Sequence, residues 1–338
     1  MLKKKGKYTT LIKVKRSTGL ERRTTMNVFK YTLDIDDDDS SEVTYDKTST
    51  TVCGWFTKDT EGQYCEDKKY VKYLCMPQSN RVRFDLNKTH SNDVYKSQEK
   101  MSETIDSMLH WISLHSMDPS GKPQLPDTEF VCYRGLLSRI MWTPYEKSDS
   151  LKLCAVRLNN IIYLYAPNAT PDTDQPLSEF EETCCMFTSQ IGSHKIMYGA
   201  ELDGFPNEEA FTDLSTAKFV ELKTCKENPS EYSFKRFKLL KWWSQSWLVD
   251  IDKVVVGYRD DKGFRFWNDK TCKKFLVDFL SFVKFAMRDA PNDDPNAVYN
   301  FEWDPNNADT IDFTGTRLPS DHQCKFIPEW YLEWLNKV

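Results

Sequence analysis

The sequence has few of the residues that build zinc centres and phosphate-binding loops. Its 338 residues include only five histidines and twelve glycines; the histidines form no cluster, and no glycine-rich phosphate loop is present. Ten cysteines occur, but no two have the Cys-x-x-Cys spacing of a zinc or redox motif. These absences argue against a zinc protein and a P-loop protein. We expect reduced cysteines that pack as small apolar side chains.

Long hydrophobic runs are also missing. The most apolar segment, Phe275–Met287, is short and contains Asp278 and Lys284, so we expect no membrane span. The basic N-terminal stretch is not followed by an apolar run, so we expect no signal peptide. A net charge of −5 argues against non-specific nucleic-acid binding but is compatible with a local basic groove. With reduced cysteines, the sequence predicts a soluble protein of the nucleus or the cytoplasm.

The charge pattern separates the start of the chain from the rest. Residues 3–23 are basic and Asp34–Glu42 is an acidic run, which predicts a flexible charged segment over 1–45 and a single domain over 46–338. Within 46–338, periodicity predicts helices and strands in irregular alternation, without an internal repeat. We expect helices over 102–115, 234–248 and 273–287, and strands within 69–77, 129–144, 151–167, 198–205, 218–225 and 253–259. This mixture favours an α+β fold built around mixed sheets.

Two of the predicted strands carry paired charges. Because residues two apart on a strand share a face, Glu201 lies beside Asp203, and Glu221 beside Lys223. If the strands are neighbours, three carboxylates and one ammonium group converge, and a divalent ion would neutralise them. Oxygen ligands suit Mg²⁺ or Mn²⁺, and an E-x-D, E-x-K set is the pattern of the PD-(D/E)xK nuclease core, in which metal ions activate a water against a phosphate. The alternative is a row of solvent-facing charges on a half-exposed sheet.

The predicted helix over 234–248 has two distinct faces. One face has helical spacing of large apolar residues and is expected in the core: Leu240, Trp243 and Trp247. The other face has two lysines and a glutamine: Lys238, Lys241 and Gln245. Lysines beside an amide are suited to successive phosphates of a nucleic-acid backbone. The alternative for each lysine is ordinary solvation.

Several motifs occur together in one order. They are "FVCYRG" followed by "TPYE", "GAELD", "FVELKT", "FKLLKWWSQSWL", "VVVGYR" and "FIPEWYLEWL". In this combination, over residues 52–335, the chain resembles the DXO family of RNA 5′-end decapping exonucleases. The resemblance implies two mixed β-sheets flanked by helices, with the active site in a cleft between the sheets. It also favours the nucleus.

The resemblance implies an activity and a set of site residues. The family removes triphosphates, incomplete caps or NAD caps from RNA 5′ ends, and many members also degrade RNA from 5′ to 3′. Two Mg²⁺ or Mn²⁺ ions are implied, held by Glu181, Glu201, Asp203, Glu221 and the Leu222 carbonyl. Catalytic roles are implied for Glu201, Asp203, Glu221 and Lys223, and substrate contacts for Arg134, Lys223, Gln245, Glu103 and Cys184. No residue that would carry a contact with a protein partner is identified.

One position departs from the family's pattern. The family has a helix glutamate in the pattern G-φ-x-x-E, for which "LSEFE" offers Glu181, but Leu177 stands at the glycine position. Another alignment places "ETCCMFTSQIGSHK" on the strand after that helix, with Cys184 lining the substrate site. The alternatives to a decapping enzyme are therefore a catalytically weakened relative that binds RNA ends or a protein partner, and a DNA nuclease with the same core.

Overall fold

The structure, a computed structural model of the chain, divides into a large sheet, a small sheet and five α-helices among the parts that it describes. It describes residues 28–33, 45–74, 104–122, 124–146, 149–167, 181–214, 216–227, 238–251, 254–260, 269–292, 294–304, 311–319, 322 and 324–337. The α-helices are α1 (Asp106–His115), α2 (Arg134–Trp142), α4 (Leu240–Leu248), α5 (Asp269–Ala286) and α6 (Glu329–Leu335). Short 3-10 helices are η1 (Lys68–Tyr70), η3 (Thr143–Tyr145) and η4 (Glu209–Phe211).

The large sheet has ten strands in the order β1-β13-β12-β5-β6-β4-β8-β7-β2-β3. In chain order they are β1 (Val28–Leu33), β2 (Lys47–Lys58), β3 (Tyr64–Cys65), β4 (Phe130–Tyr133), β5 (Leu151–Leu158), β6 (Ile161–Tyr165), β7 (Thr183–Ile191), β8 (His194–Glu201), β12 (Tyr299–Trp303) and β13 (Ile311–Arg317). Among the described strands of this sheet, only β4 pairs in parallel, with β6 and β8, so the sheet is mixed.

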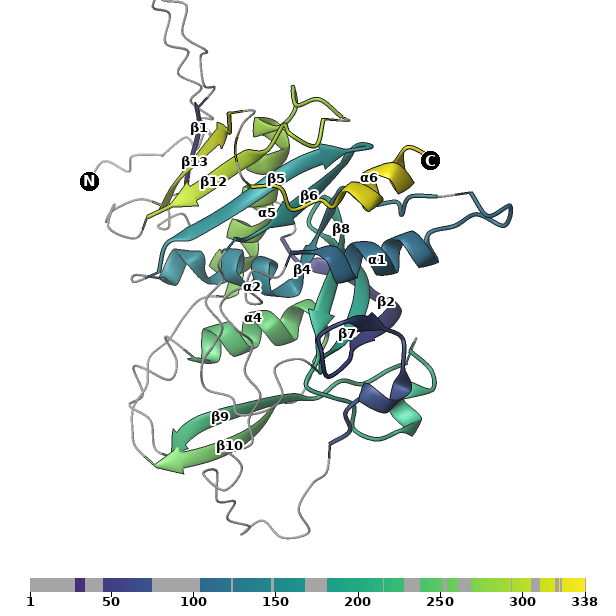
Figure 1. Cartoon of the computed structure of the whole chain (residues 1–338). Helices are drawn as coiled ribbons and strands as arrows, with labels where there is room; N and C mark the ends of the chain where they lie inside the picture. Colours follow the sequence, from purple (N-terminus) through teal and green to yellow (C-terminus); the bar gives the residue numbers. More distant parts are fainter. Residues whose placement is uncertain are drawn as a thin grey trace, which may run out of the picture.

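The small sheet consists of β9 (Glu221–Glu227) and β10 (Val254–Asp260), paired in parallel. Figure 1 shows this pair at the lower end of the molecule, apart from the large sheet. The predicted α+β fold with two sheets is confirmed, and among the described residues the second sheet has two strands only. A cleft between the sheets stays a prediction.

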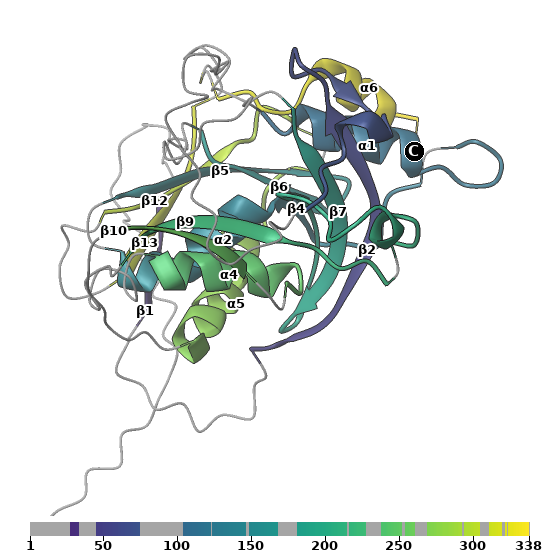
Figure 2. The ribbon, with the colours of Figure 1, turned by 90° about the horizontal axis from the view of Figure 1, so that it is seen from below.

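Both faces of the large sheet are buried. Along β7, Cys185 and Phe187 pack into the core on the side of α2, α4 and α5, whereas Cys184 and Met186 pack into a second core on the side of α1 and α6. Figures 1 and 2 both show α1 beside α6, and α2 beside α4. Burial on both faces explains why strand residues are almost continuously apolar, and it accommodates the high aromatic content.

Several elements differ from the sequence-based expectation. The sequence predicts strand within 129–144, but β4 ends at Tyr133 and α2 begins at Arg134. The predicted strand over 69–77 is instead the 3-10 helix η1 and an isolated bridge at Tyr73; residues 75–77 lie outside the described part. Within the segment 1–45, expected to be flexible, β1 pairs with β13 at the edge of the large sheet. The boundary at 45/46 stays a prediction.

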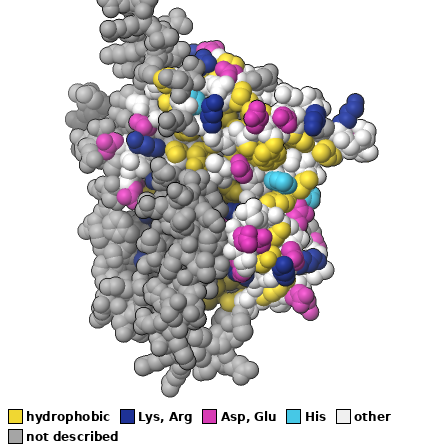
Figure 3. Space-filling model, in the orientation of Figure 1, with side chains coloured by type: hydrophobic (Ala, Val, Ile, Leu, Met, Phe, Trp, Pro, Cys, Tyr) yellow, Lys and Arg dark blue, Asp and Glu magenta, His cyan; other side chains and the backbone are white. Residues whose placement is uncertain are grey.

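The surface over α1 and α6 is partly apolar. Figure 3 shows hydrophobic side chains among charged ones over this region. Leu114 and Met117, near the end of α1, and Trp330 on α6 are exposed. None of the helices in the described ranges is long and apolar enough to cross a membrane.

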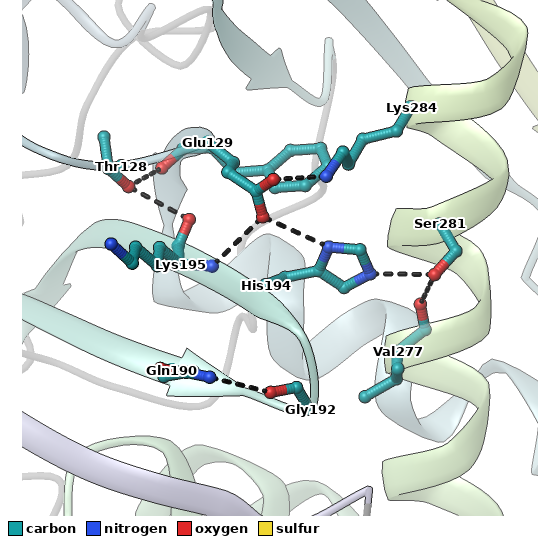
Figure 4. Close-up of polar contacts among 10 residues, drawn as sticks. Thr128, Glu129, Gln190, Gly192, His194, Lys195, Val277, Ser281 and Lys284 are labelled. Atoms are coloured by element: carbon teal, nitrogen blue, oxygen red, sulfur yellow. Dashed lines mark hydrogen bonds and ion pairs between the residues drawn. The ribbon is translucent and has the colours of Figure 1, made fainter. Parts of the chain in front are cut away.

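A buried histidine joins the start of β8 to α5. His194 is 3% exposed. Its ring lies 3.4 Å from a carboxylate oxygen of Glu129 on one side and 2.8 Å from Ser281 Oγ on the other (Figure 4). Lys284, also on α5, forms an ion pair with Glu129. Burial lowers the pKa of His194; the Glu129 carboxylate opposes this shift, and Lys284 adds to it.

This histidine predicts a pH dependence of stability. Because its pKa is lower in the folded state, the unfolded state binds the proton first as the pH falls below about 6.5. The thermal midpoint is therefore expected to decrease between pH 7 and pH 5. The His194→Gln variant is expected to have a flatter profile over the same range, measured by differential scanning fluorimetry. An equal pH dependence in both proteins would contradict this assignment.

Candidate active site

The two charged segments meet where the large sheet ends. Glu201 is the last residue of β8, and the chain continues to Gly204, whose carbonyl oxygen accepts a hydrogen bond of 2.9 Å from the backbone N–H of Val220, just before β9. The charged strands are therefore neighbours through one isolated bridge, although they belong to different sheets. A Cβ atom on Gly204 would lie 2.8 Å from the carbonyl oxygen of Lys72, so only glycine fits this junction without movement.

Glu221 and Lys223 form the inner part of the site. The Glu221 side chain is 3% exposed, and its Oε1 lies 2.6 Å from Lys223 Nζ. Its other oxygen, Oε2, is buried and has no hydrogen-bond partner among the described residues. Arg134 Nη1 lies 3.8 Å from this oxygen, beyond hydrogen-bond distance. A buried carboxylate oxygen without a donor costs free energy, so this atom is poised for a ligand that carries positive charge.

Asp203 lies beside this carboxylate. Its Oδ2 accepts a hydrogen bond of 2.6 Å from the backbone N–H of Leu222. Burial raises the pKa of Asp203, and the negative charge of Glu221 raises it further, against the opposing effects of that hydrogen bond, Lys223 and Arg134. Two carboxyl groups therefore lie close together in a partly buried place. A bound cation would relieve the repulsion between their negative charges.

Arg134 connects the three elements around the site. It is 7% exposed, and its guanidinium donates to the carbonyl oxygens of Glu201 at 2.7 Å and Gln245 at 3.2 Å. Since Arg134 begins α2, it links α2 to the end of β8 and to α4, next to Glu221. The predicted contact of Arg134 with substrate phosphates stays a prediction, while its contacts within the protein assign it a positioning role.

Helix α4 carries the predicted phosphate-binding face. Gln245 is half-buried. Lys241 Nζ lies 4.2 Å from the centre of the Trp142 ring and 3.8 Å from Glu146 Oε2, so this lysine is held over α2. Leu240 is buried as predicted, and Trp243 and Trp247 pack partly buried against the same core.

The segment leading into β7 holds a pair that sequence analysis did not single out. Lys58 at the end of β2 and Glu182 form a largely buried ion pair of 2.7 Å. The backbone N–H of Lys58 donates to the Glu182 carbonyl oxygen at 2.9 Å, so the strand pairing continues past β7. Cys184 pairs directly with Glu201, and alternation along the chain places Glu182 on the same face as both. Lys58 and Glu182 are too distant in sequence for a local pattern to join them.

Glu181 lies on the opposite side of this segment. It has no helical conformation, and its carbonyl oxygen accepts a hydrogen bond of 2.6 Å from Lys72 Nζ. The alignment that puts "ETCCMFTSQIGSHK" on a strand agrees with β7, which places Cys184 beside Glu201. The helix expected before it, and Glu103, lie outside the described residues.

The structure thus brings together most of the predicted catalytic residues. Glu221 contacts Lys223 directly, Asp203 is hydrogen-bonded to the Leu222 backbone, and Arg134 connects Glu201, Gln245 and Glu221. Over the described ranges, no three His, Cys, Asp or Glu side chains are already gathered closely enough to hold a metal ion. The nucleus of the site is therefore the carboxylate pair Asp203 and Glu221, with Lys223.

An acidic pair with a lysine, in the spacing E-x-D followed by E-x-K, is the residue pattern of the PD-(D/E)XK class of nucleases. The model of the family described as "RAI1 like PD-(D/E)XK nuclease" matches residues 48–172 and 165–265, which is more than half of the chain. The protein belongs to this RAI1-like family. The family resemblance predicted from the sequence is confirmed.

The relatives agree with this assignment over most of the chain. The Decapping and exoribonuclease protein of Bos taurus is 28% identical over 343 residues, covering 83% of each protein. The human Decapping and exoribonuclease protein is also 28% identical, over 84% of this chain and 85% of its own length. These names support the predicted activity class, a nuclease that acts in decapping.

Solved structures show the same fold. Scheffersomyces stipitis Rai1, in complex with (3′-NADP)⁺ and a calcium ion, superposes with a TM-score of 0.73 at 17% identity, covering 94% of this chain and all of its own. Candida albicans Rai1, in complex with pU5-Mn²⁺, gives a TM-score of 0.71 at 15% identity over 88% of this chain and 98% of its own. The shared architecture confirms the predicted fold class.

Proposed function

We propose that the protein is a divalent-metal-dependent hydrolase of RNA 5′ ends. The observation that carries the proposal is the buried Glu221 carboxylate, which keeps one oxygen without a hydrogen-bond donor next to Asp203 and Lys223. Family membership and relatives named for decapping support the substrate class. The substrates proposed are RNAs with a 5′ triphosphate, an incomplete cap or an NAD cap, with 5′–3′ exoribonuclease activity as a second step.

The residues present fit a divalent cation. Asp203 and Glu221 supply carboxylate oxygens, which suit Mg²⁺ or Mn²⁺. Burial, and then the charge of Glu221, raises the pKa of Asp203, so a bound cation would stabilise its ionised form. The exposed Glu201 side chain and the Leu222 carbonyl are proposed as further ligands. Bound metal would polarise the scissile phosphate and lower the pKa of a water. Two ions are proposed, by resemblance.

The chain's own residues have separate roles in this proposal. Lys223 holds Glu221 through its 2.6 Å contact, and its ammonium group is proposed to contact the phosphate that is cleaved. The Gln245 side chain, on α4, is proposed as a second phosphate contact, and Cys184, next to Glu201 across the β7–β8 pair, as part of the wall around the 5′ end. Arg134 fixes the backbones of Glu201 and Gln245 and thereby their side chains.

A fourth carboxylate would complete the proposed metal site, and the two candidates are the adjacent residues Glu181 and Glu182. The resemblance favours Glu181, whereas the strand register favours Glu182, which shares a face with Cys184 and Glu201. We expect Glu182→Gln to weaken activity about tenfold to hundredfold, the range for losing a residue that orients a ligand, and Glu181→Gln to have little effect. Rates at several Mn²⁺ concentrations measure this. The reverse result would restore Glu181 as the ligand.

The proposed function is tested with four short RNAs that differ only at the 5′ end. These carry a monophosphate, a triphosphate, an unmethylated cap or an NAD cap, each with Mg²⁺ or Mn²⁺, and the control is the double variant Glu201→Ala, Asp203→Ala. Metal-dependent release of the end group or of mononucleotides, absent in the variant, is expected. Full activity in the variant would refute the metal assignment.

Binding without any product would identify a non-catalytic RNA-end-binding member of the family, and equal cleavage of single-stranded DNA would indicate a nuclease without preference for RNA.

A further inference from the structure

Two cysteines from distant parts of the chain lie in contact. Cys154 is in β5, and Cys324 lies in the segment before α6. Their Sγ atoms are 2.7 Å apart without a bond between them, so a small movement would bring them to the S–S bond length of about 2.05 Å in a disulfide. Both residues are free thiols. The proposed hydrolase activity uses neither cysteine.

Neighbouring contacts keep the two sulfur atoms next to each other. Cys154 pairs across β5 and β6 with Tyr165, and the ring of Tyr165 stacks at 5.2 Å on Phe326, two residues after Cys324. Further along, the Tyr331 hydroxyl on α6 lies 3.2 Å from the Tyr163 hydroxyl on β6. The C-terminal segment therefore docks along β5 and β6 at three successive points, of which the cysteine pair is the first.

The two thiols differ in exposure and in pKa, so one is suited to react with an external disulfide and the other to complete the bond. Cys154 is 3% exposed, whereas Cys324 is only partly buried and accessible from the surface. The contact with Cys154 lowers the pKa of Cys324, and the same contact together with burial raises the pKa of Cys154. Since the thiolate is the attacking species, Cys324 is the thiol that reacts first and Cys154 the thiol that resolves.

We propose that Cys154 and Cys324 form a reversible regulatory disulfide that locks the C-terminal segment and α6 onto the large sheet. The oxidant is a low-molecular-weight disulfide such as oxidised glutathione. The Cys324 thiolate attacks one sulfur of this disulfide, breaks its S–S bond and releases one glutathione thiolate. The Cys154 thiol passes its proton to a departing thiolate and attacks Cys324 Sγ, which releases the second glutathione. Two protein thiols are oxidised, and one glutathione disulfide is reduced to two thiols.

The disulfide would act on the face of the sheet that adjoins the candidate site. The C-terminal segment packs into the same core as Cys184 and α1, and α6 contacts α1. Because the bond would close a loop between β5 and the C-terminal segment, it would restrict the unfolded chain and raise the thermal midpoint. Locking α6 would also oppose local opening at the C-terminal end of the chain.

The proposal is tested by equilibrating the full chain with glutathione buffers of graded redox potential and mapping alkylated peptides by mass spectrometry. A Cys154–Cys324 cross-linked peptide is expected, together with an intact mass lower by two hydrogen atoms, a higher thermal midpoint, and reversal by dithiothreitol. Cys53→Ser, which removes an exposed thiol from β2, is the matched control and should leave the cross-link unchanged. Cys324→Ser should abolish it.

The mixed disulfide between Cys324 and glutathione distinguishes this mechanism from oxidation of a single exposed thiol. Cys154→Ala is expected to accumulate a stable mixed disulfide between Cys324 and glutathione, which the natural chain resolves. If Cys154→Ala fails to fold, the Cys324→Ser result and the redox titration of the natural chain still decide the question. Persistent glutathione on Cys324 in the natural chain, or no cross-link at a potential that modifies Cys53, would overturn the proposal. Neither outcome depends on hydrolysis of RNA.

Discussion

Replacing Glu221 by glutamine is expected to reduce the release of the 5′ end group by about a thousandfold, an effect of the size found when one preorganised charged or dipolar group is lost. Glutamine keeps the volume of the side chain and removes its charge. Lys223 loses the carboxylate that lies 2.6 Å from its ammonium group, and the atom that lacked a donor no longer attracts a cation. The measurement is a single-turnover rate at saturating RNA, repeated over a range of Mn²⁺ concentrations.

The control for this variant is Glu302→Gln on β12. Glu302 forms a 3.3 Å ion pair with Lys152, but both side chains are about half exposed, and such pairs contribute little to stability. Glu302→Gln is therefore expected to retain the natural rate. If Glu221→Gln kept its thermal midpoint and also its rate, Glu221 would not be part of the catalytic machinery. A loss of rate that high Mn²⁺ restores would place the defect in metal affinity.

Arg134→Lys is expected to lower the free energy of unfolding by about 3 kcal/mol, since breaking a buried charged network leaves its partners unpaired. Lysine retains the charge but lacks the planar fork with which Arg134 reaches two carbonyl oxygens and approaches Glu221. The activity should fall together with stability, because the backbones that carry Glu201 and Gln245 lose their common donor. Urea unfolding at constant pH measures the first effect.

Arg139→Lys is the matched control for Arg134→Lys. Arg139 lies in the same helix, α2, and its guanidinium Nη2 donates to the carbonyl of Ser150 at 3.0 Å in an exposed contact. Its replacement is expected to change the free energy of unfolding by less than about 1 kcal/mol. Equal effects at both positions would mean that general properties of α2, rather than the links made by Arg134, determine the loss.

The core of the candidate site was accessible from the sequence because its pattern is local. Glu201 and Asp203 are separated by one residue, as are Glu221 and Lys223, and strand alternation alone predicts that each pair shares a face. We inferred that the two charged segments lie next to each other, and the bridge between Gly204 and Val220 confirms this. The sequence did not predict that Arg134 donates hydrogen bonds to backbone carbonyl oxygens of the site, because the motif around Arg134 does not indicate which groups its guanidinium contacts.

Other features depend on contacts between distant residues. Lys58 and Glu182 become neighbours only because β2 pairs with β7, and no local signal joins them. Helix α2 was assigned to a strand because its apolar residues follow those of β4 without a break; Leu136, Leu137, Ile140 and Met141 are all buried. Their spacing is helical, but α2 has no side chain that caps its first turn, so its start is not marked in the sequence.

The position of β1 has a consequence for synthesis of the chain. Val28 pairs with Thr316 and Leu33 with Ile311, so β1 leaves the ribosome long before the strand that pairs with it. Until then, the backbone donors and acceptors of β1 have no strand beside them, and a strand with unpaired edges is a template for pairing with another chain. Removal of the first 45 residues would transfer that exposed edge to β13 in the finished protein. The acidic run that follows β1 in the sequence supplies like charges, which oppose such pairing between nascent chains.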